Sequence, residues 1–356
     1  MSFLSVVNIY RRKCTRTLTL FLMKSQERPL PQKEVLHVLV VRPNHRLGNQ
    51  LLLTPLLQEL EHVFPNCEIT LLTRGSLSRI LFSGFPNVKH FIQLPKKPFD
   101  ALFLYLKTWI KLYRKPYDLV VNVDGNSSSG RIATRIVKAP VKLYGENQTD
   151  TPLPEAQLPL HLGQRPVALL RAYMERIGFK AEVRAIPHLH LPLSLSQQNQ
   201  GFATLQNLVS HPSQTLVLFT YATGRKLLPK SWWQELYAEI KAAFPHYSIL
   251  ELLPNEKVSQ LDFCCPTYYS DSVHEIAALL QHTQLFVGTD SGIMHLASAS
   301  GVPTLGLFSV SSTAKYAPYG KNQKGINILT TTPVEIVGEM QQVLVHSKCK
   351  KMEQLG

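Results

Sequence analysis

The sequence predicts an α/β protein built from two doubly wound parallel sheets. Short apolar stretches alternate with amphipathic stretches of helical length, an order typical of parallel strands joined by helices. This alternation occurs twice, and a proline-rich stretch at about 150–200 separates the two series. With 356 residues, 44% of them hydrophobic and 17% charged, the chain is long enough for two globular domains.

In the first series, apolar runs and the residues that end them predict the strands and helices. Strands are expected at 35–42, 67–75 and 117–125. A helix is expected from Gly48 to about Val63, and another at 99–116, where Pro116 ends the helical spacing. Within the proline-rich stretch, 167–180 has helical spacing.

The second series repeats the same order. A strand that runs into a loop is expected at 215–224, further strands at 247–254, 284–290 and 303–309, and helices at 230–245, 272–283 and 291–301. We expect a leader at 1–33, one domain at 34–195, another at 196–345, and a basic tail at 346–356. No internal repeat interrupts this division.

The net charge of +14 is unevenly distributed. The first fifty residues contain nine Lys or Arg and two Glu, which is half of the excess. Such a bias suggests an anionic partner, and a nucleic acid, a bacterial inner-leaflet membrane and a nucleotide-sugar diphosphate fit the charge equally well. Nothing but the charge supports a nucleic acid, so none is expected as a partner. Arg11, Arg12 and Lys13 separate two short apolar pieces, which predicts either a segment lying on an anionic membrane or a frayed leader.

The five cysteines are odd in number and follow no metal-ligand or CxxC spacing. This favours free thiols in a reducing cytosol. No GxGxxG follows any expected strand, which argues against a nicotinamide-dependent oxidoreductase.

The stretch LFVGTDSGIMHLASASGVPTLGLFS at 285–309 reads as strand, helix and strand. Asp290 is expected to cap the helix, and the free backbone N–H groups of Ser291, Gly292 and Ile293 would form an anion site. His295 falls one turn into the helix and would face the same place.

Two further loops follow strands of the same series. TYATGRKLLPKSWWQEL at 220–236 carries Thr223, Arg225 and Lys226, whose side chains suit a phosphate. LLPNEKVSQL at 252–261 places Glu256 beyond a strand end, where it could accept a ribose hydroxyl. Because the carboxyl ends of parallel strands share one edge, these loops should converge there.

Taken together, these motifs resemble glycosyltransferase family 9, the heptosyltransferase-like enzymes of lipopolysaccharide core assembly. GTDSGIMHLASASGVPTLGLF is similar to the family's Asp-(Thr/Ser)-Gly-x-x-His signature, and RPNHRLGNQLLLTPLLQEL and YDLVVNVDG resemble its N-terminal elements. The resemblance spans about 35–345. It implies a GT-B fold, with two Rossmann-like domains facing a cleft, the acceptor bound by the first and the donor by the second.

The resemblance also implies residue roles and a metal-independent, inverting transfer without a cofactor. Asp290, Ser291, Gly292 and His295 would contact the sugar and diphosphate of the donor, Lys226 the phosphates, and Glu256 the ribose. The leaving diphosphate would be stabilised by Lys226 and the helix end at Ser291. No Asp-x-Asp element for a metal diphosphate is found, and no metal site is expected.

The first loop, VRPNHRLGNQ, departs from the family pattern. The family places a Gly-Asp pair there, whose carboxylate is the general base, whereas this chain has Gly48 and Asn49 next to Arg46. An amide cannot take the acceptor proton. Asp124, at the end of the strand 117–125, and His45, in the first loop, are the two candidates for the base, and Asp124 is preferred.

The sequence therefore predicts a glycosyltransferase that moves a heptose or related sugar to a lipid-linked or oligosaccharide acceptor. The expected location is the cytoplasm, at the inner face of the bacterial inner membrane. A relative that binds nucleotide sugar without transferring it, motivated by Asn49, and a sugar-nucleotide epimerase are the alternatives.

Overall fold

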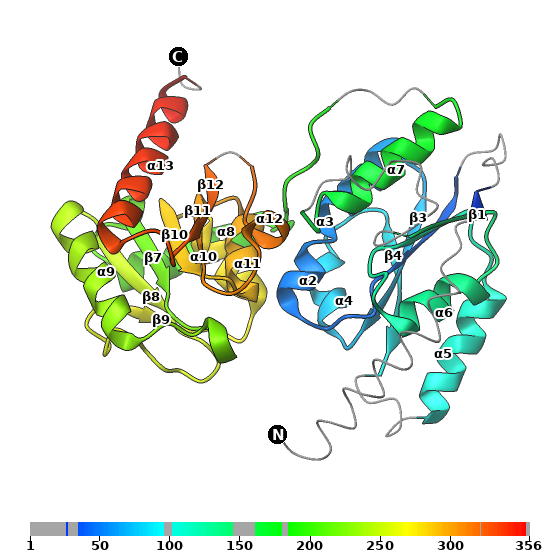
Figure 1. Cartoon of the computed structure of the whole chain (residues 1–356), viewed down its shortest axis with the longest axis horizontal. Helices are drawn as coiled ribbons and strands as arrows, with labels where there is room; N and C mark the ends of the chain where they lie inside the picture. Colours follow the sequence, from blue (N-terminus) through cyan, green and yellow to red (C-terminus); the bar gives the residue numbers. More distant parts are fainter. Residues whose placement is uncertain are drawn as a thin grey trace. The chain divides into compact units, whose positions relative to one another are not determined.

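The computed structural model describes residues 26–27, 35–95, 102–144, 161–179, 184–320 and 322–353. The chain forms two compact units (Figure 1). The first consists of Met1–Arg46 and Pro55–Pro187, and the second of Leu47–Thr54 and His188–Gly356. The predicted basic cluster at 11–13 lies outside the described residues.

The first unit contains one six-stranded sheet. Its strands are β1 (Gln26–Glu27), β2 (His37–Val41), β3 (Glu68–Arg74), β4 (Val88–Leu94), β5 (Leu119–Asn122) and β6 (Val141–Tyr144). They lie in the order β1-β6-β5-β2-β3-β4. All neighbours are parallel except β1 and β6.

Helices cover this sheet. They are α3 (Thr54–Val63, whose first residue belongs to the second unit), α4 (Leu77–Phe82), α5 (Leu102–Arg114), α6 (Ser128–Ile136) and α7 (Arg165–Arg176). On one face, Leu112 of α5 and Ala133 of α6 pack in one buried cluster with side chains of four strands, such as Leu39.

The second unit contains another six-stranded sheet, and all its neighbouring strands are parallel. Its strands are β7 (Thr215–Phe219), β8 (Ser248–Leu252), β9 (Thr267–Tyr268), β10 (Leu285–Thr289), β11 (Thr304–Phe308) and β12 (Gln323–Asn327). Their order is β12-β11-β10-β7-β8-β9.

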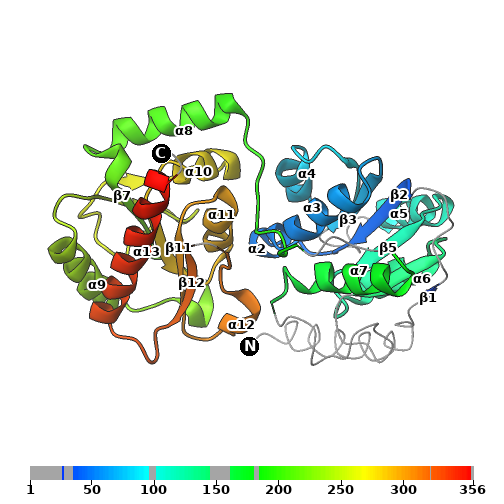
Figure 2. The ribbon, with the colours of Figure 1, turned by 90° about the horizontal axis from the view of Figure 1, so that it is seen from above.

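The helices of the second unit lie on both faces of its sheet. They are α2 (Leu47–Leu51), α8 (Leu195–Leu208), α9 (Lys230–Ala243), α10 (Val273–Leu280), α11 (Gly292–Ser300), α12 (Thr313–Tyr316) and α13 (Pro333–Glu353). The helices α9 and α13 pack together in one cluster with strand side chains, whereas α10 packs between α8 and α11 (Figure 2).

Both sheets follow the Rossmann-like order in which the first long strand of the series is central. In the first unit β2 lies between β5 and β3, and in the second unit β7 lies between β10 and β8. Strand order therefore reverses between β2 and β5, and between β7 and β10. Such reversal points are where open α/β sheets bind ligands, beyond the carboxyl ends of the strands.

The predicted α/β class with two parallel sheets is confirmed, and one helix is divided. The helix expected from Gly48 to Val63 is two helices, α2 and α3. In a continuous helix Pro55 would donate its N–H to the carbonyl of Leu51, but proline has none. The hydroxyl of Thr54 donates to that carbonyl instead, at 2.8 Å.

Among the described helices, none combines the length and the apolar content that crossing a bilayer requires.

Candidate functional site

The loops after β7 and β10 meet at the reversal point of the second sheet. Lys226 ends a short 3-10 turn, Gly224–Lys226, and its Nζ donates to Oδ2 of Asp290 at 2.5 Å. The Asp290 side chain is only 7% exposed, whereas that of Lys226 is 37% exposed. A buried carboxylate thus holds a partly exposed ammonium group at the edge where the sequence predicted a phosphate site.

The cap of the helix α11 lies one residue later than predicted. Its N-cap is Ser291, whose hydroxyl accepts from the backbone N–H of Met294 at 3.2 Å. The cap predicted at Asp290 is therefore wrong, because Asp290 still belongs to the sheet edge and donates its own N–H to the carbonyl of Leu307. Its side chain is consequently available for Lys226. The helix ends at Gly301, whose φ of +87° is left-handed.

The first turn of α11 lies against α2, and both belong to the second unit. A Cβ built on Gly48 would lie 2.6 Å from Cδ2 of His295, and one built on Gly292 would lie 3.0 Å from Cβ of Leu47. His295 itself is buried. Two glycines therefore allow a close approach that brings α2 next to the histidine of the signature.

The remaining residues predicted for donor binding lie in exposed loop positions. Thr223 and Arg225 are exposed on the loop after β7, and Glu256 is exposed four residues beyond the end of β8. Within these described loops, no hydrogen bond or ion pair joins Glu256 to the Lys226–Asp290 pair.

A carboxylate that sequence reasoning missed lies deeper in the same edge. Glu251, in β8, is fully buried and accepts from the hydroxyls of Thr220 at 2.6 Å and Ser259 at 2.5 Å. These bonds tie the loop after β7 to the loop after β8. The sequence signal was a single acidic residue inside the apolar run YSILELLP.

In the first unit, the two candidate bases follow neighbouring parallel strands. His45 is exposed in the loop after β2, and Asp124 is half-buried two residues after β5. Arg46 is exposed in the same loop as His45. The backbone N–H of Arg46 donates to Oδ1 of Asn44. Asn49 lies in α2, in the second unit.

The loop that carries Asp124 is held by buried polar contacts. The backbone N–H of Asp124 donates to Oδ1 of Asn122 at 3.0 Å. Arg131, fully buried in α6, donates through Nη1 to the carbonyl of Gly125 at 2.6 Å. The carboxylate therefore sits on a fixed turn, and no sequence motif had indicated the role of Arg131.

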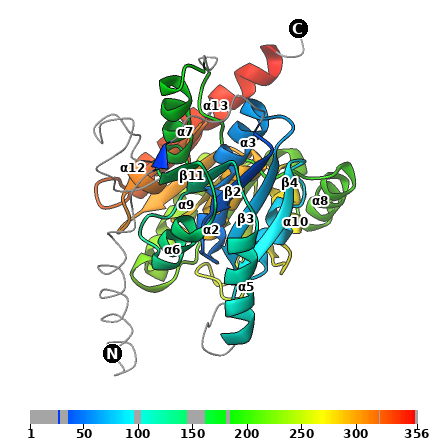
Figure 3. The same cartoon turned by 90° about the vertical axis from the view of Figure 1, so that its right-hand side faces the viewer.

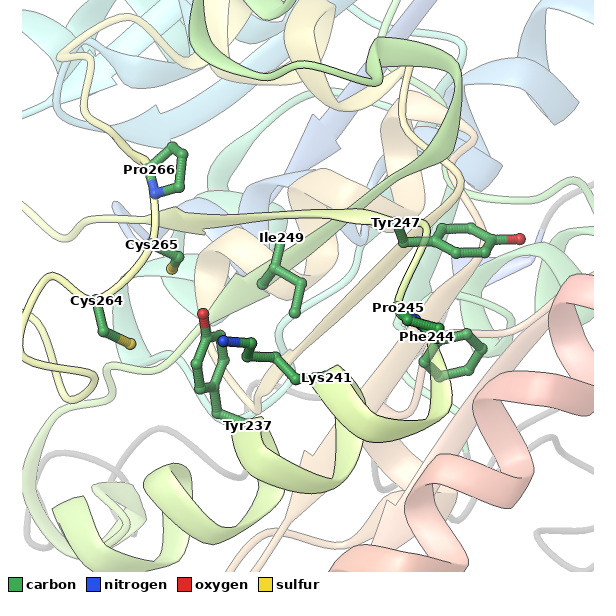
Figure 4. Close-up of a pocket in the computed structure, with 9 residues that line it drawn as sticks. All are labelled: Tyr237, Lys241, Phe244, Pro245, Tyr247, Ile249, Cys264, Cys265 and Pro266. Carbon is green, nitrogen blue, oxygen red and sulfur yellow. The ribbon is translucent and has the colours of Figure 1, made fainter.

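In the described part of the second unit, the linings of two well-formed cavities contain no predicted site residue. Figure 4 shows one of about 320 Å³, lined by Tyr237, Lys241, Phe244, Pro245, Tyr247, Ile249, Cys264, Cys265 and Pro266. Burial raises the pKa of the Cys265 thiol to about 12, so this thiol is protonated at neutral pH. The other, of about 490 Å³, lies between α8 and the start of α10, and its lining includes Gln200, Tyr268 and His274.

No group of three or more His, Cys, Asp or Glu side chains with the geometry of a metal site occurs in the parts of the chain that the structure describes.

Comparison with known proteins points to one family. The sequence profile of Glycosyltransferase family 9 (heptosyltransferase) matches residues 270–341, which contain Asp290, Ser291 and His295. The lipopolysaccharide core heptosyltransferase OpsX of Haemophilus influenzae is 24% identical over 293 residues, covering 76% of this chain and 78% of OpsX.

Solved structures share the fold over nearly the whole chain. The family 9 glycosyl transferase of Veillonella parvula superposes with a TM-score of 0.68 at 15% identity, covering 90% of this chain and 99% of that one. The E. coli heptosyltransferase WaaC, solved with ADP, gives 0.64 at 19% identity, covering 86% of this chain and all of WaaC. Together with the signature at 285–309, these comparisons show that the chain has the fold of family 9 glycosyltransferases and resembles that family over residues 270–341.

Proposed function

We propose that this chain transfers a heptose or a related sugar from a nucleotide-diphosphate donor to a lipopolysaccharide-core or other envelope glycan acceptor. The names of the relatives support the sugar and the acceptor class, since OpsX is a lipopolysaccharide core heptosyltransferase and WaaC was solved with ADP. The transfer would take place in the cytoplasm, at the inner face of the inner membrane, where the enzyme can reach a lipid-linked acceptor.

The ion pair of Lys226 and Asp290 beside the first turn of α11 carries the proposal. A diphosphate placed there would meet the ammonium group of Lys226 and the positive end of the helix at Ser291 and Gly292. As the glycosidic bond to the donor breaks, negative charge grows on the leaving phosphate, and these groups stabilise it without a metal. Arg225 and Thr223 lie on the same loop and extend the phosphate site.

The acceptor hydroxyl attacks the anomeric carbon from the face opposite the diphosphate, so configuration is inverted. Its proton passes to a base of the first unit, for which Asp124 is our choice and His45 the alternative. We prefer Asp124 because its turn is fixed by Asn122 and Arg131, and catalysis by a positioned base requires such a fixed geometry.

A second candidate function is binding of nucleotide sugar without transfer. It is favoured by Asn49, which stands where the resemblance implies a carboxylate base. A sugar-nucleotide epimerase is the third, and would change the donor with no acceptor present.

The test is a donor screen followed by a turnover assay. Thermal unfolding is measured with ADP-, GDP- and UDP-sugars, because a ligand that binds only the folded state raises stability by mass action. The best donor is then incubated with lipid-linked core acceptor and the product identified by mass spectrometry. Donor binding without product supports the binding protein, a changed sugar without acceptor supports the epimerase, and no binding contradicts all three.

A further inference from the structure

The helix α5 carries a row of large apolar side chains on its outer surface. Phe103 is 82% exposed, Leu106 53%, Ile110 52% and Tyr113 55%. Their spacing of three, four and three residues places them on one face of the helix. Single exposed apolar residues are ordinary, but four in one row on one helix indicate a surface for binding. We call these four residues the α5 stripe.

The opposite face of α5 holds the helix to its unit. Leu112 is fully buried, and Tyr105 and Trp109 pack against the same core cluster as β2, β4 and α6. The helix therefore has a conventional inner face in addition to the stripe. Figure 3 shows α5 beside α6 and β4 at the edge of the first unit.

Cations lie along one side of the stripe. Lys107, Lys111 and Arg114 are exposed, and the helix contains no acidic residue. In the described part of the chain no carboxylate forms an ion pair with any of the three. A further lysine, Lys138, places its Nζ 5.1 Å from the ring centre of Tyr113.

We propose that α5 docks the first unit on an anionic phospholipid surface. An apolar face bordered by Lys and Arg suits the boundary between headgroups and acyl chains, where apolar side chains insert and cations meet lipid phosphates. A second copy of this chain is a poorer occupant, because its own Lys107, Lys111 and Arg114 would face an equally basic surface. The docking surface is formed by residues outside the leader at 1–33 and does not depend on the proposed transfer reaction.

The first test removes apolar contact. Full-length protein is floated with vesicles of phosphatidylcholine, with and without phosphatidylglycerol, and Phe103→Ser combined with Ile110→Ser is compared with the parent. We expect the variant to partition at least roughly tenfold less onto anionic vesicles. Leu195→Ser with Leu329→Ser is the matched control, since these side chains are 77% and 73% exposed in the second unit, and it should bind like the parent.

The second test reverses charge. Lys107→Glu with Lys111→Glu should reduce binding to anionic vesicles by roughly tenfold or more, because each cation near such a surface adds attraction. Lys241→Glu with Lys315→Glu changes the net charge equally at exposed positions of the second unit and should have a small effect.

The third test locates the contact. A Phe103→Trp variant should gain fluorescence that brominated lipids quench, whereas Leu195→Trp should not. The proposal is overturned if both α5 double variants bind like the parent, or if brominated lipids leave the added fluorescence of Phe103→Trp unquenched, which would leave the leader as the anchor. It is also overturned if α5 variants convert a dimer to a monomer without changing vesicle binding, which would identify a second copy as the occupant.

Discussion

Gly48 of α2 lies against the imidazole of His295 in α11, so closely that a Cβ on Gly48 would be 2.6 Å from Cδ2 of the ring. Gly48→Ala should therefore displace His295 and the first turn of α11. Overpacking of this kind typically costs about 1–3 kcal/mol of the free energy of unfolding. We expect the rate of sugar transfer to fall by more than this loss of folding stability accounts for. Denaturant unfolding and turnover measure the two effects. Gly338→Ala, in the interior of α13, is the control, because an added Cβ there meets nothing within 4 Å. It should leave turnover unchanged and should not lower stability, since alanine inside a helix is favoured over glycine by about 0.5–1 kcal/mol.

Replacing Lys226 should weaken donor binding. Lys226→Ala removes a charged hydrogen-bond donor, which is worth about 1.5–3 kcal/mol, and it leaves the buried carboxylate of Asp290 without its observed cation. Calorimetry with the nucleoside diphosphate measures the loss. The control is Lys230→Ala, which breaks another lysine–aspartate pair, with Asp262, in which both side chains are about half exposed. Equal diphosphate affinity of Lys226→Ala and the parent would remove Lys226 from the donor site.

Asp124 and His45 are distinguished by parallel substitution. If Asp124 is the base, Asp124→Asn should lower turnover by roughly 10²–10⁴-fold with donor affinity near normal, and His45→Ala should cost much less. Both variants are measured with the same acceptor. An inactive His45→Ala with an active Asp124→Asn would assign the base to histidine.

The same experiment with Asn49→Asp restores the residue that the family resemblance implies. The added carboxylate either raises turnover or, if it lies close to Asp124, lowers it by raising a carboxyl pKa. An increase in Asn49→Asp that persists when Asp124 is replaced would show that the restored carboxylate acts by itself.

Stability should depend on Glu59 in a pH-dependent way. This side chain is 2% exposed and accepts from Nε of Arg171 at 2.8 Å and Nη2 of Arg184 at 2.6 Å. Burial alone would raise the Glu59 pKa, but the two arginines outweigh it and hold the pKa below 4.5. Removing one partner of such a buried pair costs about 3–5 kcal/mol, so Glu59→Gln should be strongly destabilised at pH 7.

The lowered pKa of Glu59 decides the direction in which its stabilisation changes with pH. The stabilisation by Glu59 is fully present above pH 4.5 and is lost as pH falls through the lower, folded-state pKa. The difference in free energy of unfolding between the parent and Glu59→Gln should therefore shrink below pH 4.5. Glu68→Gln, whose side chain is 44% exposed beside His90, should cost less than about 1 kcal/mol and serves as the control. A difference that is constant down to pH 3 would contradict the assignment.

The long apolar strands and the signature loop were predictable because their signals are local. The strand β10, the helix α11 and the strand β11 all come from one run of sequence with caps and a terminal glycine, and only the cap was misplaced, from Ser291 to Asp290. Capping depends on one φ/ψ choice, and both Asp and Ser are good caps, so the residue types alone do not decide it.

What the sequence did not reveal depends on long-range contacts. The edge strand β4 and the strands β6 and β12 were not predicted, nor were α6, α8 and α13. The strand β4 mixes buried and exposed residues, and it is the last strand in the order of the described sheet. The partners of Glu251 and Arg131, and the pairing of Lys226 with Asp290 across 64 positions, arise only once the strands are in order.

The membership of Leu47–Thr54 in the second unit has a consequence for dissecting the protein. The chain passes between the units three times, after Arg46, after Thr54 and after Pro187, instead of once. A single cut after Pro187 would yield a C-terminal fragment without α2, so that His295 and Gly292 would lose the surface on which they pack. Separately produced halves therefore differ from the native units, and the C-terminal half should regain its native form only when a peptide containing Leu47–Thr54 is supplied in trans.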